Sequence, residues 1–425
     1  MMIAATQPGG MSVSTAPRTT SAPAAGSARH GTGFWLIAAV FVVAMAFSTV
    51  PAPLYPIYQR QDGFTSFTVT IIFAVYAVGV VTSLLLAGHV SDWVGRKRIL
   101  LPALGLEAFA ALLFLFWPTL PGLLVARFST GLGVGMITAT ATAFLLELHA
   151  AHRPQAGRGR FELVSAAANL GGLGSGTLVA GALAQYVTAP LRTPYVVFLV
   201  LLALSAVAVA AVPETVTAPD VPPRYRPQRI RVAPNDRLGY ATATAGGFVA
   251  FAVFGLFTSL APSFVAGALH HPGRLLAGVV AFLVFGAGAA AQAGSGSLPA
   301  AWRFRTSLLA EAAGLLVLAA GMWAASLALF LLGGAIAGAG AGLLFKSAVG
   351  TVSGMAAPQW RGEALAGLFL IAYLGLVGPV LGLGIATRYV PATTAMLWFT
   401  GVLLAVLAGI GVAARTNRRD QKAGR

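Results

Sequence analysis

Long runs of apolar residues alternate with short polar or charged segments along almost the whole chain. A helix needs roughly 20 mainly apolar residues to cross about 30 Å of hydrocarbon. By that criterion we predict twelve membrane-spanning helices. They cover residues 34–54, 66–89, 99–117, 121–148, 162–187, 194–213, 239–267, 275–298, 306–325, 327–353, 363–388 and 392–414. The runs are continuously apolar and lack the alternation of barrel strands, so the predicted fold class is an all-α integral membrane protein.

Two polar segments interrupt this pattern and define the predicted domains. Residues 1–32 are rich in Ser, Thr, Ala, Pro and Gly without an apolar core, which predicts a disordered cytoplasmic tail rather than a signal peptide. Residues 214–238 are rich in Pro and Arg, which is typical of a linker. We therefore predict six-helix bundles over 33–213 and 239–414, joined by a cytoplasmic linker and followed by a basic cytoplasmic tail at 415–425.

Composition narrows the function classes further. Only 9% of the residues are charged and 57% are hydrophobic, whereas an average soluble protein has about 25% charged residues. This excludes soluble enzymes and, despite the net charge of +16, nucleic-acid binders. The absence of Cys excludes disulfides and thiolate metal sites. Of the 27 Lys and Arg residues, 21 fall on the side that holds both termini, which predicts cytoplasmic termini in a multi-pass plasma-membrane protein.

The two halves of the chain resemble each other at a shift of about 205 residues. Gly131 and Gly133 align with Gly338 and Gly340, and similar matches follow in order elsewhere. Chance similarity between Gly- and Ala-rich helices is the alternative explanation. Because each half has an even number of spans, the two repeats share one orientation in the membrane. Parallel repeats of this kind place a substrate site between them near the midplane.

The turn between the second and third spans carries the most specific motif. Gly88, Asp92, Gly95, Arg96 and Lys97 lie within an eleven-residue stretch of sequence. The glycines permit a tight turn, and the Asp carboxylate can cap a helix N-terminus. The cations suit the anionic cytoplasmic leaflet, which is the plain positive-inside explanation. That explanation accounts for neither the Asp nor the glycine spacing.

This stretch resembles the signature of the major facilitator superfamily, G-x-L-x-D-R-x-G-R-K-x, with departures at Ser91 and Trp93. The resemblance implies two pseudo-symmetric six-helix bundles, as in the twelve-helix drug:proton antiporter group. It also implies a conformational latch, in which Asp92 docks at Arg361–Glu363 when the cavity faces outward and Arg96 pairs with Glu147. The corresponding stretch of the second half, 295–305, lacks the Asp, so the expected latch is one-sided.

Glycine motifs in the fifth and eleventh spans resemble the bending motif of antiporters. Gly172, Gly176 and Gly181 fit a degenerate G-x-x-x-G-P-x-x-G-G pattern, and Gly378 precedes Pro379 in the eleventh span. A proline inside a span frees a backbone carbonyl and allows bending. Close helix packing alone also selects such glycines, and that alternative stays open.

Four charged residues lie well inside predicted spans, away from the span ends, namely Glu107, Arg127, Glu311 and Lys346. Each costs at least ~2.5–3.5 kcal/mol at the bilayer centre, so each is a functional candidate. A carboxyl group in an apolar environment favours its neutral form, which makes Glu107 and Glu311 candidates for proton coupling; a structural role is the alternative. The resemblance implies that the first, fourth, seventh and tenth spans line the cavity, with Arg127 and Lys346 on its wall.

Four uncharged residues complete the cavity candidates: Asn169, Tyr373, Phe47 and Phe257. Simple core packing is the alternative for any one of these aromatic residues. The sequence has no cluster with metal-ligand spacing and no phosphate-binding loop. We therefore expect no metal, no cofactor and no enzymatic activity, with the proton gradient as the energy source.

Together these features predict a secondary transporter that works by alternating access. Proton-coupled efflux of a small amphipathic or aromatic compound is the first hypothesis, and proton-coupled uptake of a small organic anion or another solute is the alternative. The expected partners are a small-molecule substrate and the lipid bilayer, without nucleic acid, and we expect a monomer.

Overall fold

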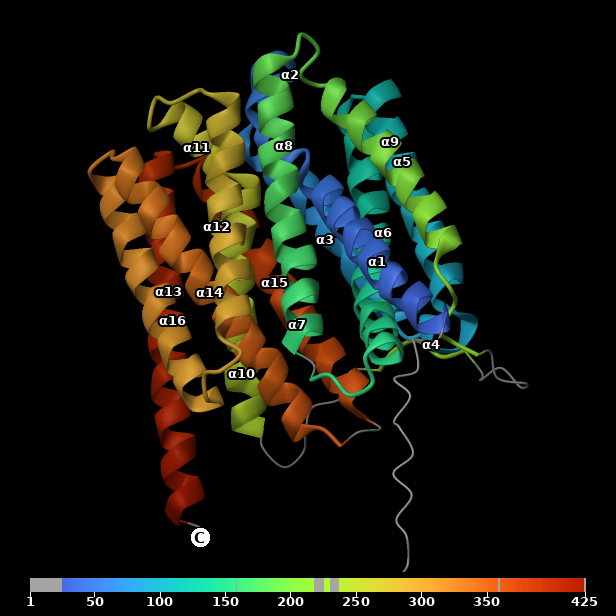
Figure 1. The fold of residues 1–425 in the computed structure, drawn as a ribbon. Coiled ribbons are helices and arrows are strands. Elements are labelled where there is room, and N and C mark those ends of the chain that lie inside the picture. The colour runs from blue at the N-terminus through green and yellow to red at the C-terminus, as the bar shows by residue number, and fades with distance from the viewer. Residues whose placement is uncertain (1–24, 158, 218–224, 230–236, 358–359, 424–425) are drawn as a thin grey trace, which may run out of the picture.

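The computed structural model describes residues 25–157, 159–217, 225–229, 237–357 and 360–423, and its regular structure is helical (Figure 1). Among these residues, twelve helical stretches are long and apolar enough to cross a membrane, which confirms the twelve predicted spans. The first half comprises α1 (Ala25–Thr49), η1 (Ala52–Leu54), α2 (Tyr55–Asp62), α3 (Ser66–Ala87), α4 (Ser91–Val94), α5 (Arg96–Phe116), α6 (Leu120–His152), α7 (Gly159–Ala166), η2 (Ala167–Gly171), α8 (Gly172–Tyr186) and α9 (Thr193–Ala211). The second comprises α10 (Arg237–Ser259), α11 (Ala261–Gly267), α12 (Arg274–Gly294), α13 (Ala300–Trp323), α14 (Leu327–Met355), α15 (Arg361–Ala386) and α16 (Ala392–Ala423).

The first span of each half is interrupted near its end. After α1 the chain passes through η1 and α2, and Pro51 and Pro53 lie at this break. After α10 it continues as α11, with Pro262 in the first turn. Proline lacks the N–H that a continuing helix needs, so both interruptions have the same cause. A break at the same place in both halves agrees with the internal repeat.

Both ends of the described chain are more helical than predicted. Helix α1 begins at Ala25, so residues 25–32 are helical rather than part of a disordered tail, while 1–24 lie outside the described residues. Helix α16 continues to Ala423 and so includes most of the predicted tail at 415–425. Hydropathy detects where a helix enters lipid, but a helix can extend beyond that point into the aqueous phase. Of the linker, 218–224 and 230–236 lie outside the described residues.

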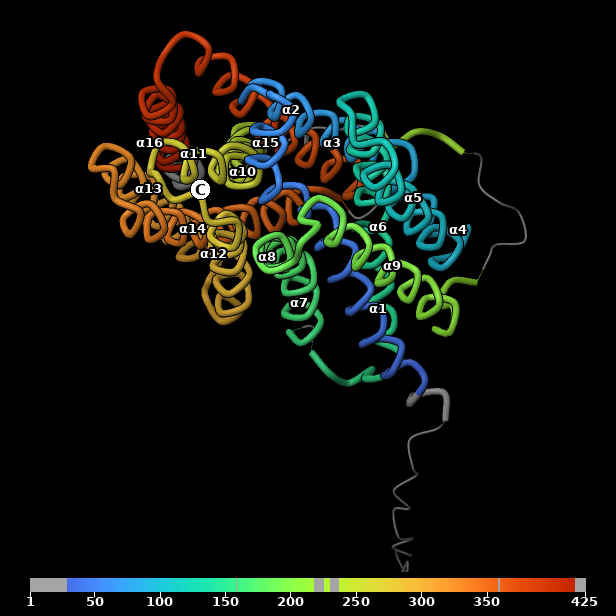
Figure 2. Tube along the Cα trace, turned by 90° about the horizontal axis from the view of Figure 1, so that it is seen from above, coloured from blue at the N-terminus to red at the C-terminus, as the bar shows by residue number. Residues whose placement is uncertain are grey.

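The two halves lie side by side and meet along two pairs of helices. Figure 2 shows α8 beside α12 and α15 beside α3, and both pairs are in direct contact. Gly181 of α8 and Gly278 of α12 face each other, with no room for a side chain at either position. Thr177 Oγ1 donates to Gly278 O at 3.0 Å across the same contact. Small residues thus let the halves approach closely, as expected in a membrane.

The glycines of the predicted bending motif lie mainly at helix contacts. Gly172 and Gly176 of α8 pack against α1, and a Cβ atom at either would collide with it. Helix α8 is uninterrupted from Gly172 onward, whereas the π-helical turn η2 precedes it. Gly378 and Pro379 lie within the continuous helix α15. The packing explanation therefore accounts for Gly172, Gly176 and Gly181.

We call the end of the bundle where α9 ends and α10 begins the linker face, and the other end the opposite face. The start of α1 and the end of α16 also lie at the linker face (Figure 1). Helices α2 and α11 lie at the opposite face and contact each other there. Since each half crosses the bundle six times, both ends of the described chain lie on one side.

Candidate functional site

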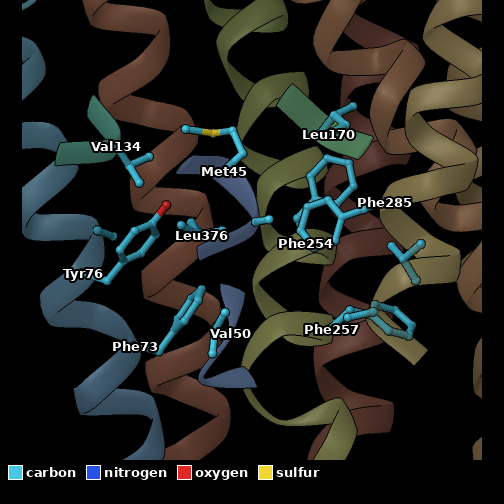
Figure 3. Packing of buried hydrophobic residues seen from close by; sticks show 14 of the residues in the cluster. Met45, Val50, Phe73, Tyr76, Val134, Leu170, Phe254, Phe257, Phe285 and Leu376 are labelled. Carbon is cyan, nitrogen blue, oxygen red and sulfur yellow. The ribbon is translucent and has the colours of Figure 1, made fainter. Parts of the chain in front are cut away.

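A cavity of about 660 Å³ lies between the two halves. Its wall comes from α1, α3, α6 and the α7–α8 segment on one side and from α10, α12, α14 and α15 on the other. Figure 3 shows the neighbourhood of this wall, with Phe73 and Tyr76 on one side of Leu376 and Phe254 and Phe285 on the other. The Phe254 and Phe285 rings stack at 4.8 Å between centroids. The lining is mainly aromatic and aliphatic.

The cavity extends toward the linker face and is closed toward the opposite face. At its linker-face end it reaches Glu162 near the start of α7 and Arg303 near the start of α13. At the opposite face, polar contacts join the halves: Ser263 Oγ donates to Gln59 Oε1 at 2.6 Å, and Arg274 Nη1 donates to Ala184 O at 2.8 Å. The structure therefore has the linker face as its accessible side.

Arg127 lies on the cavity wall and is almost completely buried, at 3% exposure. Its Nη1 donates to Ser48 O at 2.7 Å. The guanidinium carbon lies 4.3 Å from the centre of the Tyr76 ring and 5.9 Å from that of Phe73. Nε has no hydrogen-bond partner in the described part of the chain. The site thus contains a cation surrounded by aromatic faces.

Lys346 lies on the same wall, nearer the linker face, and it has partners. Its Nζ donates to Gln292 O at 2.8 Å and lies 3.9 Å from Glu162 Oε2. The ion pair joins α14 in the second half to α7 in the first. Arg303, a third cation of the lining, has an Nε atom without a partner among the described residues.

Four of the six predicted cavity residues line the cavity: Arg127, Lys346, Asn169 and Tyr373. The predictions for Phe47 and Phe257 are wrong. Phe47 points to Phe198 of α9, with ring centres 6.2 Å apart, and Phe257 points to Phe330 of α14, at 5.7 Å. Each is adjacent in sequence to a lining residue, Ser48 or Thr258, but one residue turns a helix by about 100°.

Sequence reasoning missed Glu162 as a cavity residue, because its position near a span boundary suggested a loop or interface role. It is the only Asp or Glu in the described cavity lining. The available signal was that the spans predicted to line the cavity hold no acid except Glu147, which was already expected to pair with Arg96. A carboxylate near the cavity mouth was then the remaining partner for Lys346.

Glu107 and Glu311 lie outside the cavity lining in equivalent places of the two halves. Glu107 of α5 packs against Gly133 of α6, and Glu311 of α13 packs against Gly340 of α14. Both are fully buried, and their carboxylate oxygens have no hydrogen-bond partner among the described residues. Their proton-coupling role stays a prediction, and their positions give them no contact with the cavity.

The predicted latch is a connected network around Arg96, which we call the Arg96 network (Ser91, Asp92, Arg96, Glu147 and Glu214). Arg96 Nη2 donates to Glu147 Oε1 at 2.6 Å, so the predicted pairing is present. Its Nη1 donates to Asp92 Oδ1 at 2.6 Å and to Ser91 Oγ at 2.7 Å. Asp92 therefore binds Arg96 and not the start of α15, the docking place expected for an outward-facing cavity.

The glycines of the motif serve the turn itself. Gly95 has φ of +114°, a conformation that favours glycine, and it ends α4 immediately before α5 begins. Gly88 follows the last turn of α3, where a Cβ atom would approach Leu84 O within 2.7 Å. Lys97 Nζ donates to Ala210 O at the end of α9, 2.7 Å away. The turn is thus tied to the end of the first half.

Sequence reasoning did not identify Glu214, which belongs to the same network. Glu214 Oε1 accepts from the Arg96 N–H at 3.1 Å, and Oε2 accepts from the Lys97 N–H at 3.0 Å. Burial raises the pKa of this carboxyl, but hydrogen bonds from four backbone N–H groups outweigh it and hold the pKa below its ordinary value. An acid directly after a span on a strongly basic face was the available signal.

The twelve spans, the cavity between two helical halves and the charged turn define a multi-pass membrane transporter. The sequence profile of the Major Facilitator Superfamily matches residues 36–323, more than half of the chain, and the chain belongs to this superfamily. Its family and fold are those of secondary transporters.

Among curated proteins, a segment of 52 residues is 42% identical to the bacillibactin exporter of Bacillus subtilis (strain 168). That segment covers 12% of this chain and 13% of the exporter.

Solved structures with the same fold cover most of the chain. The human organic anion transporter MFSD10 (TETRAN) is 16% identical with a TM-score of 0.63, covering 90% of this chain and 99% of that one. The nucleoside transporter NupG is 12% identical with a TM-score of 0.68, covering 90% and 99%. An inward-facing bacterial homologue of the human lysosomal transporter Spinster is 14% identical with a TM-score of 0.67, covering 92% and 98%. At these identities the likeness concerns the fold alone.

Proposed function

We propose that this transporter exports a small amphipathic or aromatic compound in exchange for protons, by alternating access. The observation that carries the proposal is the aromatic cavity between the halves. Its aromatic lining residues are Tyr55, Phe73, Tyr76, Phe161, Phe251, Phe254, Phe285, Phe345, Phe369 and Tyr373. Such a lining buries aromatic rings favourably and leaves a few polar groups to orient them. The short match to an exporter supports the outward direction.

We further propose that the linker face is the cytoplasmic face of the plasma membrane. Most Lys and Arg residues lie in segments at this face, and basic residues are retained on the cytoplasmic side. The cavity would then be accessible from the cytoplasm in this state, which is where an exported compound must enter.

Glu162 is the carboxyl group best placed to couple protons to substrate movement. It faces the cavity and pairs with Lys346 across the two halves at 3.9 Å. Protonation of Glu162 would remove its charge and end the attraction to Lys346. Because the pair joins α7 to α14, its loss would remove one contact that holds the linker-face ends of the two halves together. Glu107 and Glu311 lack this link to the cavity.

The test measures proton movement in inside-out membrane vesicles with an imposed pH gradient and a pH-sensitive dye. The panel contains lipophilic cations, aromatic antibiotics and organic acids. We expect at least one compound to discharge the gradient only when the transporter is present. Glu162→Gln should abolish this discharge, whereas Asp62→Asn, which changes an exposed acid at the opposite face, should not. Discharge that persists in Glu162→Gln would remove Glu162 as the coupling residue.

A second candidate is proton-coupled uptake of a small organic anion. The observation that favours it is the charge of the lining, which among the described residues has three cations, Arg127, Arg303 and Lys346, and one acid, Glu162. Accumulation of a labelled organic acid in intact cells, stopped by a protonophore, would favour uptake over export.

A further inference from the structure

We infer that Arg127 is the binding site for an anionic group of the substrate, so that the substrate class is an aromatic organic anion. This assignment rests on the proposed transport function and concerns the same cavity. It names the chemical group that is recognised and the residue that recognises it, whichever direction transport takes.

Arg127 carries a buried charge, and no counter-ion pairs with it among the described residues. It is the eighth residue of α6, in the part of this span nearer the opposite face, and is 3% exposed. No carboxylate lies within ion-pair distance of it in the described part of the chain. Glu107, on the neighbouring helix α5, is itself without a hydrogen-bond partner there. Burying a cation without a partner costs several kcal/mol of desolvation free energy, roughly, and an anion that reaches the cation offsets part of this cost.

Arg127 also has N–H donors that no described group uses. A guanidinium group has five N–H donors. The hydrogen bond to Ser48 O uses one of them, and Nε has no partner among the described residues. The Tyr76 ring, 4.3 Å away, attracts the cation but does not accept N–H hydrogen bonds from the guanidinium group as a carboxylate does. A carboxylate in the cavity can therefore accept a hydrogen bond from a guanidinium donor that Ser48 O does not use.

The other two cations of the described lining, Lys346 and Arg303, are less suited to bind the anionic group. Lys346 already has Glu162 and Gln292 O as partners, so it has less need of an anion from the substrate. Arg303 lies at the linker-face end and is only half-buried. It can attract an anion to the mouth but is more strongly solvated there. Arg127 is the most buried of the three cations, and no described acid neutralises its charge.

The aromatic part of the substrate has a place beside the same residue. Phe73 and Tyr76 flank Arg127 from the first half. Across the cavity, Phe251 contacts Tyr373 edge to face, with 5.2 Å between ring centres. A ring attached to the anionic group would lie between these two aromatic pairs. Recognition would thus combine one charged contact with ring packing.

Three probes with one ring system and different charges test the assignment on the purified full-length protein. They are 2-naphthoate, 2-naphthylmethanol and 2-naphthylmethylamine, which carry a negative, no and a positive charge. Binding of radiolabelled 2-naphthoate is measured by scintillation proximity, with the other two as competitors. We expect the anion to bind at least about tenfold more tightly than the alcohol, about 1.4 kcal/mol, and the amine to bind most weakly.

Variants locate the preference. Arg127→Gln should weaken 2-naphthoate binding to the level of the alcohol. Arg127→Lys should keep part of the preference, because it keeps the charge but loses the planar fork. Arg192→Gln removes an exposed cation outside the cavity lining and should change nothing. Thermal unfolding of each variant shows whether it is folded.

Several results would overturn the assignment. In the wild-type protein these results are equal binding of the three probes, tighter binding of the amine than of the anion, or no binding of any probe. These three outcomes are measured without any variant. An unchanged preference in folded Arg127→Gln would show that the anion binds elsewhere. If 2-naphthoate binds as expected but no compound moves protons in vesicles, the anion site stands and the proposed antiport fails. If the vesicle assay shows transport of cations only, the proposed antiport stands and the anion site at Arg127 fails.

Discussion

The turn between α3 and α5 and its counterpart between α12 and α13 place corresponding arginines in different environments. A shift of 207 residues aligns Arg96 with Arg303. Arg96 binds Asp92 and Glu147, each at 2.6 Å. The same shift places Pro299 on Asp92 and Gly354 on Glu147. Arg303 therefore lacks both acids, its Nε atom has no partner among the described residues, and it lines the cavity.

This difference shows how a repeated framework acquires separate tasks. In the first half, the hydrogen bonds of Arg96 connect the turn to Glu147 of α6 and to Glu214 at the start of the linker. In the second half the loss of two acids leaves the arginine available to the cavity. The helix packing of the two halves has changed less, since Glu107 and Glu311 both pack against a glycine of the next helix.

The largest expected effect comes from breaking the Arg96 network. Arg96→Gln leaves Glu147 and Asp92 without their cation in a part-buried site. We expect the free energy of unfolding to fall by about 2–3 kcal/mol, less than the ~3–5 kcal/mol of a fully buried pair, because the Glu147 side chain is 33% exposed. Thermal unfolding in detergent measures the change.

Arg303→Gln is the matched control, since it changes the equivalent residue without breaking an ion pair. Its midpoint of unfolding should stay close to that of the wild type. If both variants lower the midpoint of unfolding equally, the ion pairs of Arg96 add no stability beyond what Arg303 provides without them.

A smaller effect is expected from restoring the missing acid in the second half. Gly354 lies near the end of α14 with open space around the position of a Cβ atom. Gly354→Glu would offer Arg303 the partner that Glu147 offers Arg96. We expect about 0.5–1 kcal/mol of added stability, as for a partly exposed pair, and slower transport because Arg303 is drawn away from the cavity.

Gly354→Gln separates the charge from the side chain. Replacement of glycine in a helix stabilises it in both variants, by up to about 1 kcal/mol. Only the glutamate should slow transport in the vesicle assay. If both variants slow it equally, the bulk of the new side chain is responsible and the arginine is not.

The predictions that were confirmed rest on the length of the apolar runs or on a motif with specific spacing. The predictions for Phe47 and Phe257 failed because they depend on the rotation of each helix about its axis. The twelve spans follow from the number of apolar residues that a bilayer requires. The pairing of Arg96 with Glu147 followed from a motif whose spacing is specific. Phe47 and Phe257 were assigned to the correct helices but to the wrong faces. Glycine- and alanine-rich spans carry little amphipathic signal, so sequence alone does not give their rotation.

Contacts between segments distant in sequence were the other failure. Glu214 binds the start of α5 across 118 residues of chain, and Glu162 approaches Lys346 across the two halves. Neither acid is part of a local motif, so neither contact has a signature in one sequence. Both involve acids on a face where bases predominate, which is the signal that such a search should use.

Glu214 gives a prediction for the dependence of stability on pH. Its four backbone hydrogen bonds favour the carboxylate, so the pKa in the folded protein lies below the ordinary value of 4.5. A lowered pKa means that this stabilisation is complete above 4.5 and is lost as pH falls through the folded pKa. Glu214→Gln should therefore unfold at a lower temperature than wild type near neutral pH, with the difference shrinking in acid.

The measurement is the midpoint of thermal unfolding of both proteins across this pH range in one detergent. Asp62→Asn serves as the control, because Asp62 is an exposed acid at the end of α2. A difference between wild type and Glu214→Gln that is unchanged at acid pH would show that the side chain acts by shape and not by charge.

The smallest effects are expected at Glu107 and Glu311, where the two halves are most alike. Each carboxyl is fully buried without a hydrogen-bond partner in the described chain and lies outside the cavity lining. An amide has nearly the same shape as a neutral carboxyl group. We therefore expect Glu107→Gln and Glu311→Gln to leave proton-linked transport within about twofold of wild type, a difference of about 0.4 kcal/mol.

Gly133→Ala and Gly340→Ala test the same two contacts from the other side. A Cβ atom at Gly133 would lie 2.9 Å from both Glu107 Cγ and Ala103 O, and one at Gly340 would collide more closely with the backbone of Glu311. Because the clash at Gly340 is closer and involves only Glu311 at its backbone and Cβ, Gly340→Ala should lower stability more than Gly133→Ala. If Glu107→Gln instead abolishes proton movement while Glu311→Gln does not, Glu107 carries protons despite its distance from the cavity lining, and the two halves differ in function at the place where their packing is most similar.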